Sequence, residues 1–173
     1  FLDKHFPTNG HWQGLRLGWT TVVWLPFILS EGDHRLARVE PWVKAHQRTL
    51  SRCLDQQVKP RDLPDDRLAT TLDSLGVPAR WGAFEHGLHQ SVLRVDDLQG
   101  RVVRVDMTTA AASVTPAGMC QLGQSKDHRP ALPQGKIAMA VLDPLGVPLT
   151  TTVVAGQTAD DPLSLPEMAT VRQ

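Results

Sequence analysis

The sequence predicts a mixed α/β protein in which a helical part is followed by a part rich in strands. Through the first 95 residues, apolar side chains recur at helical spacing, as Leu68, Leu72 and Leu75 do. From residue 101 onward the pattern changes to valine-rich alternation and short apolar runs, which favour strands. We therefore expect a helical domain over residues 1–95 and a sheet-containing domain over residues 96–173.

Two helices are predicted in the first part of the helical domain. Residues 19–29 are apolar on nearly every side, which indicates a buried helix that Pro26 kinks or shortens. A second helix is expected from residue 40 to about residue 54, because Val43 and Leu50 share one face and basic residues share another. The first helix is therefore expected to be buried, and the second to be amphipathic.

Two further helices complete the expected helical domain. Asp65 or Asp66 is expected to cap the third, and Gly76 to close it, because these residue types favour the two ends of a helix. The fourth helix spans about residues 78–93. Two glycines inside it each cost about 1 kcal/mol relative to alanine, so this helix needs support from tertiary contacts.

The expected sheet begins with a valine-rich strand over residues 101–106. A continuous apolar run over residues 137–142 predicts a second strand, and residues 147–154 return as a third. Residues 143–146, Asp-Pro-Leu-Gly, form the turn between them, since proline presets φ and glycine accepts positive φ. A further short strand pair is expected within residues 114–122.

The composition is that of an ordinary globular protein, with 41% apolar and 21% charged residues. The 18 basic and 18 acidic residues give no net charge. This balance argues mildly against nucleic-acid binding, although a neutral total can hide a basic face. Cys53 and Cys120 lie far apart and outside any paired motif, which predicts reduced thiols and no zinc site.

No membrane segment is predicted. The longest apolar run, residues 20–29, is too short to span a bilayer and contains Pro26. The N-terminal residues lack the basic region and apolar core of a signal peptide. We therefore expect a cytoplasmic protein that has no membrane partner.

Asp106 is the strongest candidate for a chemical role. It ends the first expected strand and faces away from the valines of that strand. A carboxylate in this place can hold a divalent cation, because hard cations prefer oxygen ligands. Judged by chemistry alone, capping of a turn or pairing with an arginine is the commoner role. Asp160 and Asp161 are a second acidic candidate, although Pro162 favours a helix cap there.

A dense charged loop, Lys126-Asp127-His128-Arg129, follows the first strand. Lys126 and Arg129, together with His128, are candidates for contacts to DNA phosphates. A solvated loop without a partner is the alternative. Asp127 and His128 are adjacent and point apart in an extended chain, so they do not suggest an acid/base pair.

Several motifs resemble those of DDE-type insertion-sequence transposases, whose catalytic domain has a ribonuclease-H-like fold. Residues 103–109, VRVDMTT, are similar to the strand that carries the family's first catalytic aspartate. Residues 125–134 and 153–162 resemble further stretches of the family's catalytic domain. Residues 24–43 resemble the helical domain that precedes the catalytic domain. The resemblance covers nearly the whole chain. It implies that the strands are the first part of a truncated, mixed ribonuclease-H-like sheet.

The resemblance implies an enzyme of DNA transposition. Such enzymes hydrolyse a phosphodiester at the transposon end and then join the freed 3′-hydroxyl to target DNA. The family's first carboxylate ligand for two catalytic Mg²⁺ ions maps onto Asp106. The implied partners are transposon ends, target DNA and further copies of the same protein in a homo-oligomer.

The catalytic set is expected to be incomplete in this chain. The family's second aspartate and its glutamate are expected beyond Gln173, so we expect a fragment that is inactive alone. A non-catalytic DNA-binding or inhibitory truncated transposase is one alternative, and an interaction module that does not bind DNA is another. Four residues depart from the family's pattern: Met107, Ala131, Gly135 and Gln157.

Overall fold

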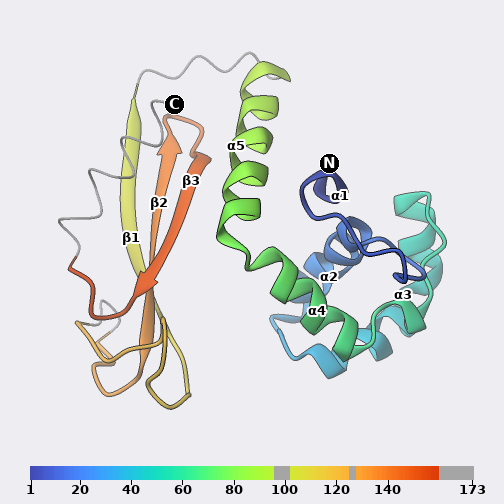
Figure 1. Cartoon of the computed structure of the whole chain (residues 1–173), viewed down its shortest axis with the longest axis horizontal. Coiled ribbons are helices and arrows are strands. Elements are labelled where there is room, and N and C mark those ends of the chain that lie inside the picture. Colours follow the sequence, from blue (N-terminus) through green and yellow to red (C-terminus); the bar gives the residue numbers. More distant parts are fainter. Residues whose placement is uncertain (96–101, 125–127, 160–173) are drawn as a thin grey trace. The chain divides into compact units, whose positions relative to one another are not determined.

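A computed structural model describes residues 1–95, 102–124 and 128–159 of the chain (Figure 1). The chain divides into two compact units, Phe1–Phe84 and Glu85–Gln173. The first unit is helical, and the second contains a three-stranded sheet together with the end of the last helix. The predicted mixed α/β composition is confirmed.

The helices follow one another in the first half of the chain, and four of them occupy the predicted places (Figure 1). Short 3-10 segments η1 and η2 precede α3 and α4. The helical segments are α1 (Leu2–His5), α2 (Leu17–Glu31), η1 (Leu36–Arg38), α3 (Val39–Leu54), η2 (Pro60–Asp62), α4 (Asp65–Leu75) and α5 (Pro78–Val95).

The ends of two helices differ in detail from the prediction. Pro26 lies inside α2 and does not shorten it, because α2 continues to Glu31 and ends at Gly32 in a left-handed conformation with φ of 58°. The N-cap position of α4 is held by Pro64, without a side-chain cap, and the two predicted capping aspartates lie in the first turn. Their charges still favour the helix, because carboxylates interact well with the positive N-terminal end. Gly76 ends α4 with a right-handed φ of −72°.

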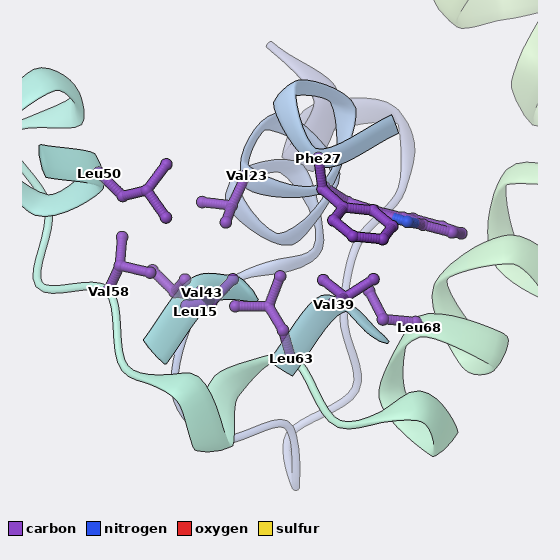
Figure 2. Close-up of a cluster of buried hydrophobic side chains, with 10 residues drawn as sticks. Leu15, Val23, Phe27, Val39, Val43, Leu50, Val58, Leu63 and Leu68 are labelled. Atoms are coloured by element: carbon purple, nitrogen blue, oxygen red, sulfur yellow. The ribbon is translucent and has the colours of Figure 1, made fainter. Parts of the chain in front are cut away.

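The core of the helical unit forms where α2, α3 and α4 meet (Figure 2). Residues three, four or seven apart on a helix share a face, so α2 and α3 each present an apolar stripe to this core. Each fully buried aliphatic or aromatic side chain contributes roughly 1.5–3 kcal/mol. The converging side chains are Leu15, Val23, Trp24, Phe27, Val39, Val43, Leu50, Val58, Leu63 and Leu68.

The first part of α5 receives the tertiary support that its glycines require. The ring of Phe84 lies 5.7 Å from those of Phe1 and Phe6 and 5.4 Å from that of Trp81. Aromatic pairs at such distances add to the stabilisation that burial provides. These contacts tie α5 to the N-terminal residues of the chain.

The sheet consists of β1 (Val103–Ala111), β2 (Gln134–Leu142) and β3 (Val147–Ala155). The strands pair in the order β1-β2-β3, and both pairings are antiparallel (Figure 1). The β2–β3 turn lies at residues 143–146, as predicted, with a cis Asp143–Pro144 bond and Gly146 at φ of 68°.

Two predictions about the strands are wrong. The first strand runs to Ala111 rather than ending at Asp106, because Thr108 to Ala111 continue the ladder with β2. Residues 114–122 do not form a strand pair and make only isolated bridges, Ala117 with Cys120 and Gln121 with Gln134. Among the described helices, none is long and apolar enough to cross a membrane.

Candidate functional site

Asp106 lies in the middle of β1, on the strand face that it shares with Arg104 and Thr108. These three side chains are exposed and Val105 is half-buried, because successive side chains of a strand point to opposite sides. The predicted orientation of Asp106 is therefore confirmed. Its predicted place at the end of the strand is wrong, since the pairing with β2 continues to Ala111.

The Asp106 carboxylate contacts the backbone in the part of the chain that the structure describes. Its Oδ1 accepts a hydrogen bond of 2.8 Å from the backbone N–H of Met107. Arg104, two residues earlier, donates instead from Nη2 to Oδ2 of Asp143 at 2.8 Å. Within the described residues Asp106 forms no ion pair. Its second carboxylate oxygen therefore stays available to a ligand from solvent.

Asp106 suits one ligand position of a magnesium site, because Mg²⁺ binds hard carboxylate oxygens and keeps several waters. A two-metal site needs more than one carboxylate. No group of three or more His, Cys, Asp and Glu side chains among the described residues is placed to hold a metal ion. Asp160 and Asp161 lie outside the described residues. The described part thus offers one ligand and not a complete metal centre.

The predicted DNA-contact residues follow β1 in the chain. Lys126 falls outside the described residues. His128 and Arg129 are both exposed, and His128 has a positive φ of 56°. The loop leaves the sheet after Ala111, so roughly 17 Å of strand separates Asp106 from the point where the loop begins. The strand therefore does not bring these loop residues beside the candidate carboxylate.

A basic hollow in the helical unit was missed in the sequence. It has a volume of about 860 Å³, and its lining includes Arg16, Lys59, Arg61 and Arg67. Arg16 is the N-cap residue of α2, and Lys59 is the N-cap residue of η2. Arg61 lies in η2, and Arg67 lies on α4. No motif links them, because only the fold brings position 16 next to positions 59–67.

The described residues thus offer an exposed carboxylate on the sheet that forms no ion pair among them and, independently of it, a basic hollow in the helical unit. Comparisons of the chain with protein-family models, with curated proteins and with solved structures found no match. The residues and their geometry are therefore the basis of the functional proposal.

Proposed function

We propose that this chain is part of a DDE-type DNA transposase and that Asp106 is the first of its metal-binding carboxylates. The order of elements supports the proposal: a strand bearing the aspartate, a charged loop, then an antiparallel hairpin. The same order is implied by the sequence resemblance. The single observation that carries the proposal is that Asp106 is exposed on β1 and forms no ion pair among the described residues.

In this proposal the reaction is phosphodiester cleavage at transposon ends followed by strand transfer into target DNA. Mg²⁺ ions, when bound, would stabilise the attacking and leaving oxygens. Asp106 would hold one such ion through its carboxylate. Lys126, His128 and Arg129 would contact phosphates along the DNA. Because one carboxylate cannot assemble the site, the chain by itself should bind DNA without cutting it.

The proposal extends to the fold and the assembly. The three antiparallel strands would be the first strands of a ribonuclease-H-like sheet, and further strands would complete it. In a sheet with free edges, pairing with another chain satisfies exposed backbone groups. The complete protein would accordingly act as a homo-oligomer that holds transposon ends and target DNA together.

The test begins with the coding sequence after the codon for Gln173. An open frame with an aspartate on an apolar strand and a glutamate on a helix would supply the missing ligands. The longer protein should nick a plasmid carrying the element ends in Mg²⁺. Asp106→Asn should slow nicking by about 10³-fold, equal to about 4 kcal/mol of transition-state stabilisation. The matched control is Asp73→Asn, an exposed aspartate on α4, which should leave the rate unchanged.

An unchanged nicking rate in Asp106→Asn would show that the metal assignment is wrong. The alternative function is a non-catalytic, DNA-binding or inhibitory truncated transposase. It is favoured by the lack of any three-residue metal-binding group in the described part of the chain. A stop codon directly after Gln173, together with slower transposition when the chain is added to a complete enzyme, would support this alternative.

A further inference from the structure

Three neighbouring hollows cross the helical unit and share lining residues. The central hollow, of about 860 Å³, shares Gln57 with a second hollow that is lined by Arg48 and Arg52 of α3. It also shares Gln13 and Arg67 with a third hollow. The three hollows therefore adjoin one another, and we call their combined surface the basic groove.

Positive charge is concentrated in the basic groove. Residues 1–84 contain eleven Lys and Arg and nine Asp and Glu, so the unit as a whole is close to neutral. Three acidic residues line the groove: Asp3, Asp62 and Asp66. Six basic residues line it: Arg16, Arg48, Arg52, Lys59, Arg61 and Arg67. The groove therefore carries an excess of positive charge that the neutral total conceals.

Two of the acidic residues are already engaged. Asp3 accepts a hydrogen bond of 2.8 Å from the backbone N–H of Gly18. Asp62 is buried, accepts a hydrogen bond from the N–H of Lys59, and lies 3.8 Å from Nη1 of Arg67. Arg67 also donates to the Asp62 carbonyl at 3.0 Å. These carboxylates hold the walls of the groove together.

The other basic residues of the groove are not engaged in the same way. Within the described part of the chain, the side chains of Arg16, Arg48, Arg52, Lys59 and Arg61 form no ion pair. Like charges placed close together repel one another, so this arrangement costs free energy in the absence of an anion. An anionic ligand would remove that cost.

The groove is built on a rigid frame. The guanidinium of Arg67 lies over the ring of Trp12, 5.3 Å from its centroid, and Trp12 Nε1 donates to the Leu15 carbonyl at 2.6 Å. Leu15 and Leu63 belong to the packed core. The segments before α2 and after η2 are thereby fixed relative to each other, which places Arg16 and Arg61 on one surface before any ligand binds.

We propose that the basic groove binds the phosphate backbone of DNA. The groove consists of three adjoining hollows lined by several separate cations, which suits a chain of regularly spaced phosphates better than one small anion. Side-chain amides of Gln13, Gln56 and Gln57 add hydrogen-bond donors that phosphate oxygens accept. Such contacts position DNA without reading its sequence. The inference does not depend on Asp106 or on catalysis.

The test measures binding of the full chain to a labelled DNA duplex by fluorescence anisotropy at two salt concentrations. The groove variant combines Arg16→Gln, Lys59→Gln and Arg61→Gln. Each phosphate contact contributes about 0.9 to the slope of log affinity against log salt. Loss of three contacts should therefore make the fall in affinity between about 50 and about 200 mM salt about 40-fold smaller than in the unsubstituted protein.

The matched control removes the same charges outside the groove, with Arg38→Gln, Lys44→Gln and Arg80→Gln, all exposed. It should keep the salt dependence of the unsubstituted protein. Equal effects of the two triple variants would overturn the proposal, as would no DNA binding at low salt. Binding to phosphatidylserine vesicles or to inorganic phosphate, without binding to DNA, would also overturn it. Unchanged tryptophan fluorescence and circular dichroism establish that both variants fold.

The same assay separates this proposal from the proposed catalytic function. Asp106→Asn should bind DNA as the unsubstituted chain does, because Asp106 does not line the groove. A longer protein that binds DNA through the groove but never nicks it would contradict only the transposase proposal. A longer protein that nicks DNA equally well with the groove variant would contradict only the groove.

Discussion

Burial lowers the pKa of His89 below its ordinary value of 6.5. The charge of Glu85 and the backbone of Leu149 partly oppose this effect. The buried Nδ1 of His89 has no hydrogen-bond partner among the described residues, so no protein group replaces its lost contact with water. The fold therefore favours the neutral imidazole.

A pH-dependent stability follows from this shift. The unfolded chain takes up a proton at His89 more readily than the folded chain does, so stability falls as the pH drops through 6.5 toward the lower folded pKa. We expect His89→Gln to reduce the loss of stability between about pH 7.5 and about pH 5.5. Thermal unfolding followed by circular dichroism measures it.

The control for this prediction is His34→Gln, an exposed histidine outside α5. It should leave the pH dependence as it is. If His89→Gln and the unsubstituted chain lose the same stability between the two pH values, His89 does not titrate differently in the folded state.

At the scale of the element, α2 contains a proline that lowers the stability of the helix. Pro26 lies inside the helix, where proline lacks the N–H that would donate to the carbonyl four residues earlier. Its side chain is exposed, so no core contact requires it. We expect Pro26→Ala to raise the free energy of unfolding of the helical unit by about 1–3 kcal/mol.

Tryptophan fluorescence in urea measures this change, because all five tryptophans lie within residues 1–84. Leu25→Ala is the control, since Leu25 is its exposed neighbour on α2 and its truncation should change stability by no more than about 0.5 kcal/mol. A less stable Pro26→Ala protein would mean that the proline sets the course of α2.

The end of β3 depends on a close backbone approach. A Cβ on Gly156 would collide with the carbonyl oxygens of Gln134 and Gln121. Both of these atoms belong to backbone, so neither can move without breaking the pairing around β2. We expect Gly156→Ala to destabilise the sheet by about 1–3 kcal/mol.

The matched control is Gly135→Ala on β2. Its added Cβ would meet backbone atoms at 3.8 and 3.9 Å, which is ordinary van der Waals contact. Hydrogen exchange of the β2 and β3 amides should be faster in Gly156→Ala and unchanged in Gly135→Ala. Equal exchange in the two variants would contradict the steric argument.

At the scale of the whole molecule, the sheet has two edge strands in the part of the chain that the structure describes. Within the described residues, β1 and β3 each pair with β2 only. Unpaired edges attract other strands, and Val153 on β3 is 50% exposed beside one of them. We expect self-association that grows with protein concentration in sedimentation velocity, and Val153→Lys should suppress it because an edge lysine opposes pairing.

Leu29→Lys is the control for the edge prediction. Leu29 is 83% exposed but lies on α2, in the helical unit. If association arises from exposed apolar surface in general, both substitutions should reduce it equally. A greater effect of Val153→Lys is expected from pairing at the sheet edge.

The sequence predicted the four main helices and three strands because the causes are local. Apolar spacing marks α3 and α4, and a proline and a glycine mark the turn at residues 143–146. The ends of elements were less predictable. Asp106 reads as the end of a strand, but pairing with β2 carries β1 on to Ala111. Cross-strand partners are distant in sequence and leave no local pattern.

By itself, the sequence determined the division into a helical part and a sheet, and the face on which Asp106 lies, because side-chain periodicity follows from backbone geometry. Only the tertiary structure decided that Arg104 pairs with Asp143 and that Asp106 forms no ion pair with any described residue. It also decided that Arg16 shares a surface with Lys59 and Arg61. Charge acts through distance in space, and folding sets that distance for residues that lie far apart in the chain.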